Sequence, residues 1–260
     1  PNYEAKSAYS FTVIATDAAG NNSEQAVALL INNLDEVAPT ITSGGTASAI
    51  NENSGAGQVV YTATATDTAD ISGGVSFSLK ANNSDDAGLF TINGSTGAVT
   101  LTGNPNYEAK NSYSFTVIAT DVAGNASERA VTLAILNLDE IAPTITSGAT
   151  ATAIDENSGA GQVVYTATAT DTADISGGVS FSLKANNSDD AGLFTINGST
   201  GAVTLTGNPN YEAKSAYSFT VIATDVAGNN SEQAVALLIN NLDEVAPTIT
   251  SGGKIGRAHV

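Results

Sequence analysis

The sequence predicts an all-β fold made of tandem seven-stranded Greek-key β-sandwiches. Residues 39–142 and 143–246 are nearly the same sequence twice, differing at 11 of 104 aligned positions. Within each copy, apolar and polar residues alternate with period two in short runs that turn residues separate. No stretch sustains the 3.6-residue period of an amphipathic helix. A unit of about 100 residues is the size of a whole domain, larger than a solenoid repeat.

The same repeat predicts the domain boundaries. Residues 1–45 match 209–253 at all but one position. After Gly253 the repeat pattern stops, and residues 254–260 resemble translated sequencing-adapter DNA, so they are set apart from the fold. We therefore expect the C-terminal part of a truncated repeat at 1–38, complete repeats at 39–142 and 143–246, the start of a further repeat at 247–253, and a non-native tail at 254–260.

The first half of each repeat carries three strand signals, illustrated by the copy at 39–142. Residues 46–50 form a short first strand. In residues 59–66, one face carries Val59, Tyr61, Ala63 and Ala65, and the other carries Val60, Thr62, Thr64 and Thr66. Such alternation is typical of a strand with one buried face. Residues 75–79 repeat the alternation, and glycine-containing turns separate the three runs.

The second half carries four more strand signals. Residues 90–92 and 99–101 flank Asn93-Gly-Ser-Thr-Gly97, which is typical of a β-hairpin. In residues 113–120 the face expected to be buried carries Tyr113, Phe115, Val117 and Ala119. The last strand, 131–135, places Val131, Leu133 and Ile135 on one face. These inward faces hold few aromatic side chains and no tryptophan, which predicts a modest core.

Composition limits the possible partners and chemistry. The chain has 26 acidic and 8 basic residues and a net charge of −18, which disfavours nucleic acid and anionic lipid and favours cations. Cysteine is absent, so neither a disulfide framework nor thiol chemistry is available. No apolar run is long enough to span a bilayer.

The residues that common catalytic mechanisms need are missing, so we expect that the protein is not an enzyme. The repeats contain no histidine, because His259 lies in the tail. There is no Ser/His/Asp or Cys/His set and no phosphate-binding glycine loop. Asp85-Asp86 and Asp189-Asp190 are adjacent carboxylates, but their Asn/Ser/Gly-rich loops favour turn formation and solvated charge over acid–base catalysis.

Carboxylates gather beside turns at strand ends, where alternate loops of an antiparallel sandwich meet at one pole. In the copy at 39–142 they are Glu52, Asp67, Asp70, Glu108, Asp121, Asp139 and Glu140. Two such charges about 4 Å apart repel by about 1 kcal/mol in water and about 4 kcal/mol near a protein surface. Oxygen ligands without histidine or cysteine favour calcium or magnesium, and flexible sets of many oxygens favour calcium. The sequence therefore predicts Ca2+ binding, with a merely solvated acidic surface as the alternative.

Taken in order, these segments resemble the cadherin repeat in its bacterial form. In the first copy the ordered set reads Glu52-Asn53, Ala65-Thr-Asp67, Phe90-Thr-Ile-Asn-Gly-Ser-Thr-Gly-Ala-Val99, Asn106-Tyr-Glu108, Tyr113-Ser-Phe-Thr-Val-Ile-Ala-Thr-Asp121 and Asn137-Leu-Asp-Glu-Ile-Ala-Pro143. Each motif alone is weakly specific, whereas the ordered set is strongly specific. The resemblance implies an immunoglobulin-like architecture with calcium between successive domains.

The resemblance also implies a ligand set for each junction between repeats. The middle junction would use Glu52, Asn106, Glu108, Asn137, Asp139, Glu140, Asp171, Asp174 and Asp225. The first junction would use Glu4, Asp35, Glu36, Asp67 and Asp121. The last junction would use Glu156, Glu212, Asp243 and Glu244.

Three departures from the family pattern affect this expectation. Asn106 stands where the family has aspartate, and Ile141 leaves the fifth connector position without a polar side chain. The second aspartate of the family's Asp-x-Asp is displaced by one position, to Asp70 and Asp174. We therefore expect fewer ions per junction than the family's usual three, or weaker binding, with a Kd of about 0.1–1 mM.

The predicted function is a calcium-stiffened structural extender segment of a secreted or cell-surface bacterial adhesin. Its expected partners are calcium ions, neighbouring repeats of the same chain and, for the parent protein, surface glycans or like molecules. A carbohydrate-binding module is the alternative, for which Tyr107 and Tyr211 are the candidate sugar-stacking rings. Homophilic adhesion through an exchanged N-terminal tryptophan is not implied, because the chain has no tryptophan.

Overall fold

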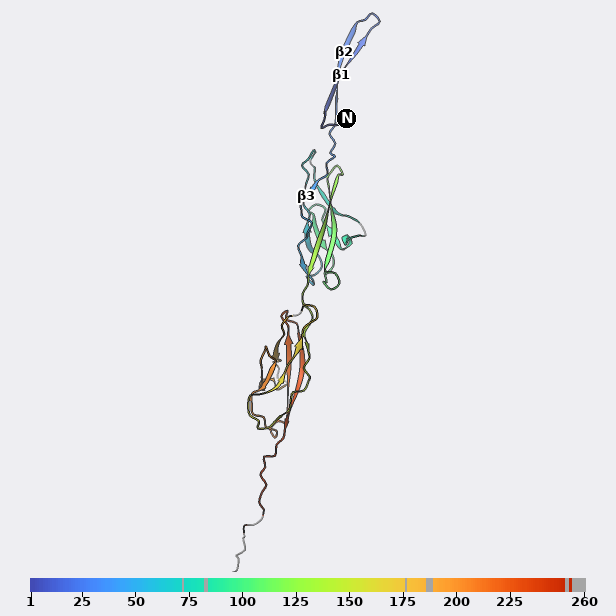
Figure 1. Cartoon of the computed structure of the whole chain (residues 1–260). Helices are drawn as coiled ribbons and strands as arrows, with labels where there is room; N and C mark the ends of the chain where they lie inside the picture. The colour runs from blue at the N-terminus through green and yellow to red at the C-terminus, as the bar shows by residue number, and fades with distance from the viewer. Residues whose placement is uncertain (72, 82–83, 176, 186–188, 251–252, 254–260) are drawn as a thin grey trace, which may run out of the picture. The chain divides into compact units, whose positions relative to one another are not determined.

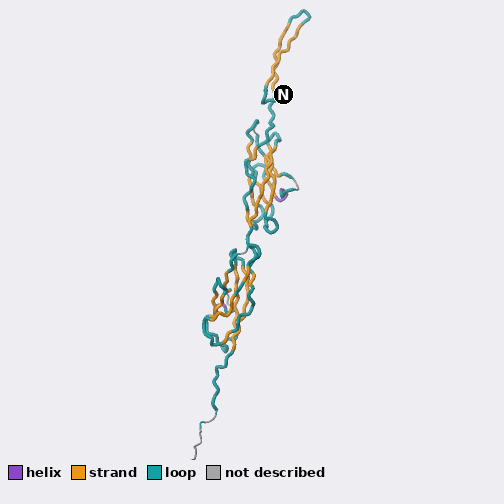
Figure 2. Tube along the Cα trace, viewed as in Figure 1, coloured by secondary structure: helices purple, strands orange, loops and turns teal. Residues whose placement is uncertain are grey.

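A computed structural model of the chain describes residues 1–71, 73–81, 84–175, 177–185, 189–250 and 253. The chain divides into two compact units, Pro1–Leu138 and Asp139–Val260. The regular structure is almost entirely β-strand (Figure 2). Within the described ranges, no helix has the length and apolar character needed to cross a membrane. The predicted non-native tail, 254–260, lies outside the described residues.

The first unit begins with a two-stranded hairpin, drawn in blue in Figure 1. Strand β1 (Ala8–Thr16) pairs antiparallel with β2 (Asn22–Leu30) along its whole length. Asp17 closes the turn, because its Oδ1 accepts hydrogen bonds from the backbone N–H groups of Ala19 and Asn21, both at 2.9 Å. The hairpin has no second sheet packed on it in the described structure, and most of its side chains are exposed.

A complete β-sandwich follows in the first unit. Its elements are β3 (Thr40–Ile41), β4 (Ile50–Asn51), β5 (Gln58–Thr62), β6 (Ala65–Thr66), β7 (Ser76–Leu79), the 3-10 turn η1 (Ala87–Leu89), β8 (Phe90–Ile92), β9 (Ala98–Leu101), β10 (Ser112–Thr120) and β11 (Ala126–Leu136). One sheet has the order β4-β11-β10-β7, the other β5-β9-β8, and β3 pairs with β6. Strand β4 runs parallel to β11, whereas the other pairs are antiparallel. The predicted all-β sandwich is confirmed.

The second unit repeats this sandwich, as its sequence requires. Its elements are β12 (Thr144–Ile145), β13 (Ile154–Asp155), β14 (Gln162–Thr166), β15 (Ala169–Thr170), β16 (Ser180–Leu183), η2 (Ala191–Leu193), β17 (Phe194–Ile196), β18 (Ala202–Leu205), β19 (Ala216–Thr224) and β20 (Asn230–Asn240). The sheet orders are β13-β20-β19-β16, β14-β18-β17 and β12-β15. Each sheet therefore has its counterpart in the first unit.

Two predicted strands are interrupted. The strand expected at 46–50 is wrong in its extent, because β4 begins only at Ile50 and Thr46 makes just an isolated bridge with Thr132. The strand expected at 59–66 is divided into β5 and β6, which pair with β9 and β3 respectively. One predicted strand thus serves two different sheets.

The strict alternation predicted at the start of this strand is also wrong. The register against β9 shifts between Val59 and Tyr61. A bulge of this kind adds one residue to one strand and turns the following side chains to the other face. Val60 and Tyr61 are consequently both buried, while Val59 is exposed. The hydroxyl of Tyr61 then donates to the carbonyl oxygen of Gly44 at 2.6 Å, tying the first segment of the repeat to β5.

Each sandwich has one core between its two sheets. In the first repeat, Phe115 and Val117 of β10 and Leu133 of β11 are fully buried, as the period-two pattern predicted. Phe90 packs against Phe115 with ring centroids 4.6 Å apart. The counterparts of these residues form the core of the second repeat. Each core thus holds together the two sheets whose strand ends carry the acidic residues.

The hairpin predicted between β8 and β9 forms around Asn93. Its Oδ1 accepts hydrogen bonds from the backbone N–H groups of Ser95 at 3.0 Å and Thr96 at 2.9 Å. Gly97 has φ +71°, and a Cβ placed on it would lie 2.2 Å from the carbonyl oxygen of Ala63. Glycine is therefore required at this position both by conformation and by space.

Candidate metal centre

Aspartates that follow strands meet an aspartate of the connector at one pole of each complete repeat. Asp67 follows β6, Asp121 follows β10, and Asp35 lies in the segment between β2 and β3. Each supplies a carboxylate oxygen within 4.8 Å of the other two. In the second unit the same group consists of Asp139, Asp171 and Asp225. All six residues were predicted as ligands, and the structure brings them together in two groups of three.

Asp121 is held in place by its own turn. Its Oδ1 accepts hydrogen bonds from the backbone N–H groups of Gly124 (2.7 Å) and Asn125 (2.8 Å). Its Oδ2 accepts one from Asn125 Nδ2 at 2.9 Å. Burial disfavours the charge, but these hydrogen bonds outweigh burial and lower the pKa of Asp121 below its usual value. The carboxylate is therefore ionised and oriented before any ion binds.

Asp67 and Asp171 supply buried oxygens that lack a donor. The Oδ2 atoms accept backbone N–H groups, from Gly73 at 3.3 Å and Gly177 at 3.1 Å. The Oδ1 atoms are buried, and within the described structure no donor reaches them. A buried acceptor without a partner destabilises the fold unless something else satisfies it.

The spacing of the aspartates fits calcium. Two oxygens on one Ca2+ lie no more than about 5 Å apart, since each Ca–O distance is about 2.4 Å. The 4.8 Å limit within each aspartate group satisfies this condition. The donors are all carboxylates, which hard cations prefer. Asp35, Asp67 and Asp121 would thus hold one ion, and their counterparts in the second unit would hold another.

A second kind of group is centred on a fully buried glutamate. Glu52, directly after β4, is 0% exposed. Its Oε2 accepts the backbone N–H of Tyr107 at 2.7 Å and its Oε1 that of Leu138 at 2.8 Å. Burial disfavours the charge, but the hydrogen bonds from Leu138 and Tyr107 outweigh it and lower the pKa of Glu52. An ionised glutamate therefore joins the turn after β9 to the chain leaving β11.

The corresponding group in the second unit contains Glu156, Glu212 and Glu244, whose oxygens lie within 4.8 Å of one another. Hydrogen bonds from the backbone N–H groups of Leu242 (2.7 Å) and Tyr211 (2.9 Å) lower the pKa of Glu156. A backbone hydrogen bond favours the charged form of Glu212, but burial and the neighbouring carboxylates raise its pKa. A divalent cation would relieve this repulsion.

In the first unit, Glu52 and Glu108 also bring carboxylate oxygens within 4.8 Å of each other, as Glu156 and Glu212 do in the second unit. Glu140 belongs to the second unit, as Asp139 does. Glu140 has the same place in the repeat as Glu244, which follows β20 and contacts Asn157 Nδ2 through its Oε1.

The structure adds Asp70 to the predicted ligands of the first junction. Asp70 lies with the predicted Glu4 and Glu36 within 4.8 Å. Its φ is +62°, a left-handed conformation that few residues other than glycine adopt, and its Oδ1 accepts a hydrogen bond from Asn33 Nδ2 at 2.7 Å. The displaced aspartate thus still reaches the connector. The sequence signal was present, as the Asp67-Thr-Ala-Asp70 run, but its unusual spacing obscured it.

Asn125 and Asn229 tie the connector to the aspartate turn, and the sequence reasoning missed them. Besides holding Asp121, Asn125 Nδ2 donates to the carbonyl oxygen of Asp35 at 2.9 Å. Asn229 does the same for Asp139 at 2.8 Å. The signal that could have identified them is the Ala-Gly-Asn that closes each turn after the strand-end aspartate.

The remaining predicted ligands have other contacts or stay as predictions. Asn106 Oδ1 accepts the backbone N–H of Ala109 at 2.6 Å and so caps a turn. Asp243 Oδ1 accepts that of Val245 at 3.1 Å. Asn137 is half-buried just after β11. Asp174 has the same φ of +62° as Asp70. Calcium coordination by these four residues remains a prediction from the family resemblance.

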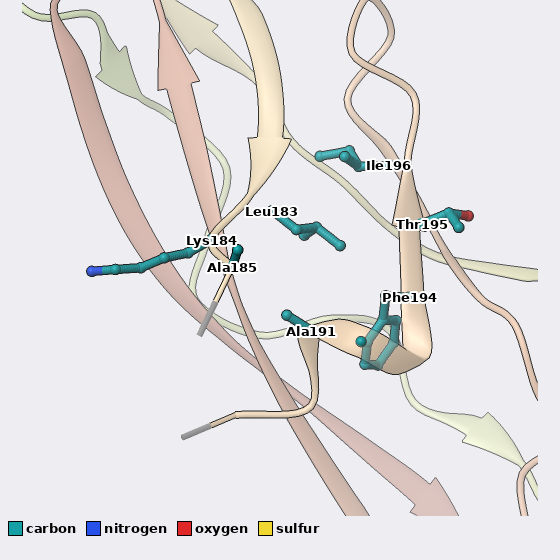
Figure 3. Close-up of a pocket in the computed structure, with 8 residues that line it drawn as sticks. Leu183, Lys184, Ala185, Ala191, Phe194, Thr195 and Ile196 are labelled. Carbon is teal, nitrogen blue, oxygen red and sulfur yellow. The ribbon is translucent and has the colours of Figure 1, made fainter. Parts of the chain in front are cut away.

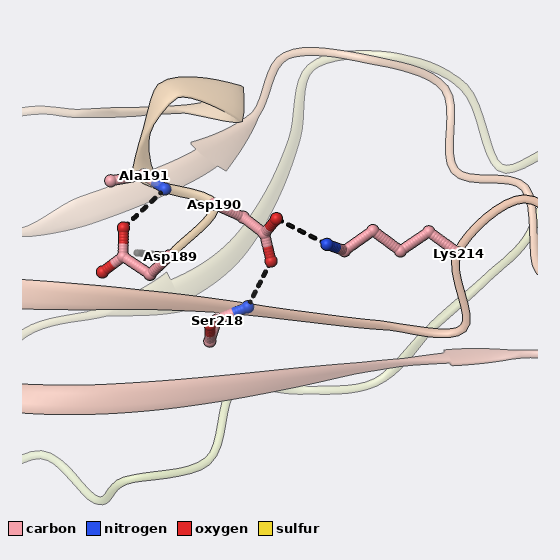
Figure 4. A network of polar contacts seen from close by, with 5 residues as sticks. All are labelled: Asp189, Asp190, Ala191, Lys214 and Ser218. Carbon is pink, nitrogen blue, oxygen red and sulfur yellow. Dashed lines mark hydrogen bonds and ion pairs between the residues drawn. The ribbon is translucent and has the colours of Figure 1, made fainter. Parts of the chain in front are cut away.

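The paired aspartates considered for catalysis form turns, but they are not simply solvated (Figure 4). Asp189 Oδ1 accepts the backbone N–H of Ala191 at 3.0 Å, and Asp190 Oδ2 accepts that of Ser218 at 2.9 Å. Asp190 also pairs with Lys214 at 2.5 Å, and both aspartates are half-buried. The prediction of solvated charge is therefore wrong here, because the loop packs against β19.

A groove of about 680 Å³ opens at the sandwich edge between β16 and β17 (Figure 3). Leu183, Phe194 and Ile196 form its apolar wall, and Lys184 is the one charged residue among the described residues that line it. None of these described lining residues is acidic, so the groove is separate from the metal-ligand groups.

Comparison with curated proteins gives distant relatives. Mouse Protocadherin Fat 2 is 33% identical over 159 residues, which are 60% of this chain and 4% of that protein. Exoglucanase B of Cellulomonas fimi is 31% identical over 248 residues, 90% of this chain and 20% of that protein. The chain thus spans only a small part of the length of these relatives.

Solved structures share the fold. Mouse Cadherin-23 EC22-24 has a TM-score of 0.56 at 24% identity, covering 93% of this chain and 77% of that one. Human Protocadherin-24 EC1-2 has a TM-score of 0.57 at 21% identity, covering 80% and 99%. A profile of the cadherin domain matches residues 46–138 and 150–241. The chain belongs to the cadherin domain family and contains two cadherin domains in tandem.

Proposed function

We propose that the chain is a calcium-stiffened structural extender segment of a secreted or cell-surface bacterial adhesin, with Ca2+ held at the repeat ends. Cadherin domains are typically extracellular and typically bind Ca2+ at the linkers between domains. The acidic groups lie at the ends of the repeats, as this role requires. The role needs no catalytic group, and we propose that the segment is not an enzyme.

The observation that carries the proposal is the group of Asp35, Asp67 and Asp121. Asp35 belongs to the connector, and the other two belong to loops of the sandwich. Without an ion their charges repel one another, and Asp67 Oδ1 has no donor among the described residues. A bound Ca2+ converts the repulsion into attraction and fixes the connector to the sandwich. Stiffness of the chain then depends on calcium.

Small-angle scattering of the whole chain during a calcium titration tests the proposal. Between chelator and about 10 mM CaCl2, the distribution of interatomic distances should narrow towards one extended state, and chelator should reverse the change. The double variant Asp67→Asn/Asp171→Asn should lose most of this response. Glu128→Gln/Glu232→Gln removes the same charge from surface ion pairs and should keep it. The proposal would be contradicted if the distribution of interatomic distances did not change up to about 10 mM Ca2+. A magnesium titration is the control, and an equal response to both ions would also contradict a calcium-specific site.

A carbohydrate-binding module is the second candidate, favoured by the similarity to a protein named as an exoglucanase. Its candidate rings, Tyr107 and Tyr211, are half-buried and pack against the two cores, which speaks against sugar stacking. Retention on a glycan array by the chain, lost in Tyr107→Ala/Tyr211→Ala, would favour this candidate over the extender.

A further inference from the structure

A serine lies on the inward face of β11, where the other alternate residues near the core are apolar. The alternate residues from Val131 to Ile135 are buried, and the same alternation, followed back towards the start of the strand, reaches Ser127. The residue opposite Ser127 on β10 is Ala119, which is 0% exposed. The serine hydroxyl therefore lies on the covered side of the sheet.

This hydroxyl has no hydrogen-bond partner in the part of the chain that the structure describes. Ser127 Oγ is buried, and so is the Oγ of Ser231, its counterpart in the second repeat, which likewise has no partner there. The Oδ1 atoms of Asp67 and Asp171 share this property. A buried polar group that makes no hydrogen bond destabilises a fold, so the hydroxyl requires a partner that the described chain does not supply.

Ser127 adjoins the aspartate group. The backbone N–H of Asp121 donates to the carbonyl oxygen of Asn125 at 3.1 Å, which continues the register that places Ala119 opposite Ser127. Side chains two residues apart on a strand point to the same face, so Ser127 neighbours Asn125 on the side where Asn125 Nδ2 donates to Asp121. Asp121 and Asp67 in turn have carboxylate oxygens within 4.8 Å of each other. The serine hydroxyl and the donor-free Asp67 Oδ1 thus belong to the same pole of the repeat.

We infer that Ser127 and Ser231 are positioning residues of the two calcium centres, and that each hydroxyl accepts a hydrogen bond from a water molecule bound to Ca2+. The inference rests on the proposed function. Ca2+ takes about six to eight oxygen ligands, which include water, and an aspartate group contains only three carboxylates. Water on a divalent cation is polarised and donates a stronger hydrogen bond than free water. The serine therefore gains its partner together with the ion and favours the ion-bound state.

A merely structural serine would behave differently when it is replaced. If the hydroxyl only filled the end of the sheet, alanine at this position would destabilise the repeat with and without calcium. If the hydroxyl is satisfied only beside the hydrated ion, alanine removes a destabilising group from the calcium-free protein and a stabilising one from the calcium-bound protein. The two effects then have opposite signs, which only the positioning role predicts.

The test compares Ser127→Ala/Ser231→Ala with the parent chain. In chelator, the melting temperature of the variant should stay the same or rise, by up to roughly 4 °C, because no unpaired hydroxyl remains buried. In isothermal titration calorimetry, its Kd for Ca2+ should be about 2- to 12-fold higher. Ser78→Ala/Ser182→Ala is the matched control, since these serines are exposed on β7 and β16, and it should change neither quantity.

An unchanged Kd in Ser127→Ala/Ser231→Ala, with the parent chain binding Ca2+, would overturn the inference and leave the proposed function intact. A lower melting temperature in chelator would also overturn it, because the hydroxyl would then have a partner without calcium. So would an equal rise in Kd in Ser78→Ala/Ser182→Ala. A parent chain that binds no Ca2+ would overturn the inference and the proposed function together.

Discussion

Asn229 donates a hydrogen bond from Nδ2 to the carbonyl oxygen of Asp139, 2.8 Å away and 90 residues earlier in the chain. The same amide group donates to Asp225 Oδ2 at 3.0 Å. The connector is thus tied to the turn after β19 without any ion, and the carboxylates of Asp139 and Asp225 are held near each other. Because the ligands are already placed, an ion that binds them has less ordering to impose.

Asn229→Ala should therefore weaken calcium binding although it removes no ligand. A neutral hydrogen bond contributes about 0.5–1.5 kcal/mol, so the Kd should rise about 2- to 12-fold, as measured by isothermal titration calorimetry. Asn230→Ala is the matched control, since the first repeat already has Ala126 at this position. Equal affinities for the two variants would show that Asn229 does not pre-organise the site.

Asp171→Asn should remove most of the calcium-induced stabilisation of the second repeat. With a Kd of about 0.1 mM, about 10 mM Ca2+ stabilises a folded domain by about 2.7 kcal/mol. The neutral amide keeps the shape of the side chain but offers a weaker ligand. Thermal unfolding with and without Ca2+ measures the difference.

Glu232→Gln is the control for Asp171→Asn. It also removes one negative charge, from an exposed pair with Lys184 at 2.7 Å. Exposed ion pairs contribute about 0–1 kcal/mol, so the calcium response of this variant should match that of the parent chain. A similar loss of response in both variants would indicate general charge screening instead of a site.

Glu212→Gln should stabilise the calcium-free protein at pH 7 and weaken calcium binding. The raised pKa of Glu212 means that the folded state disfavours its charged form. The charged carboxylate therefore destabilises the fold at pH values above the folded pKa. Below the usual glutamate value of 4.5 the group is protonated in both states, and the gain should vanish. Melting temperatures in chelator between pH 4 and pH 8 measure this window.

The pKa of Glu156 is shifted in the opposite direction to that of Glu212, so Glu156 serves as the comparison. Its lowered pKa stabilises the fold above its usual value of 4.5, and this contribution is lost as the pH falls through the folded pKa. Glu156→Gln should therefore destabilise the calcium-free protein at pH 7, where Glu212→Gln stabilises it. A shift of the same sign in both variants would contradict the assigned charge states.

Gly201→Ala should destabilise the second repeat by about 3 kcal/mol or more. Gly201 has φ +69°, and a Cβ there would lie 2.2 Å from the carbonyl oxygen of Ala167. Urea unfolding measures the change. Gly207→Ala is the control, since its Cβ would meet nothing within 4 Å, and it should cost less than about 1 kcal/mol. Equal costs would show that the hairpin relaxes around the added methyl group.

Phe219→Ala should cost about 3–5 kcal/mol, because it opens a cavity in the second core. Phe11→Ala changes the same residue in the same local sequence, but Phe11 is 55% exposed. It should change the free energy of unfolding by less than about 1 kcal/mol. The two chemical-denaturation curves, compared with that of the parent chain, separate burial from local sequence. Equal losses would mean that the first hairpin is also covered in solution.

The period-two pattern predicted the inward faces of β10 and β11 correctly, since Phe115, Val117 and Leu133 alternate without interruption. The pattern failed at Val60, where a β-bulge turns the residues that follow to the opposite face of the strand. A pattern with a fixed period of two cannot predict such a shift. The aspartate groups were foreseeable because Asp67 and Asp121 directly follow strands and Asp35 lies in the acidic connector. Asp70 and Asn125 left weaker signals, the Asp67-Thr-Ala-Asp70 run and the Ala-Gly-Asn turn, because a left-handed backbone and a side-chain bridge to a distant carbonyl leave no periodic trace.

The parallel pairing of β4 with β11 has a mechanical consequence. Besides the β4–β11 pairing itself, hydrogen bonds from Thr132 N–H to Gly45, from Ala47 N–H to Thr132 and from Glu52 N–H to Leu136 join the first segment of the repeat to its last strand. Tension along the chain pulls the start of the repeat one way and its end the other. Because the two segments run parallel, these bonds are loaded in shear and must break together, whereas an antiparallel pair of terminal strands would unzip one bond at a time.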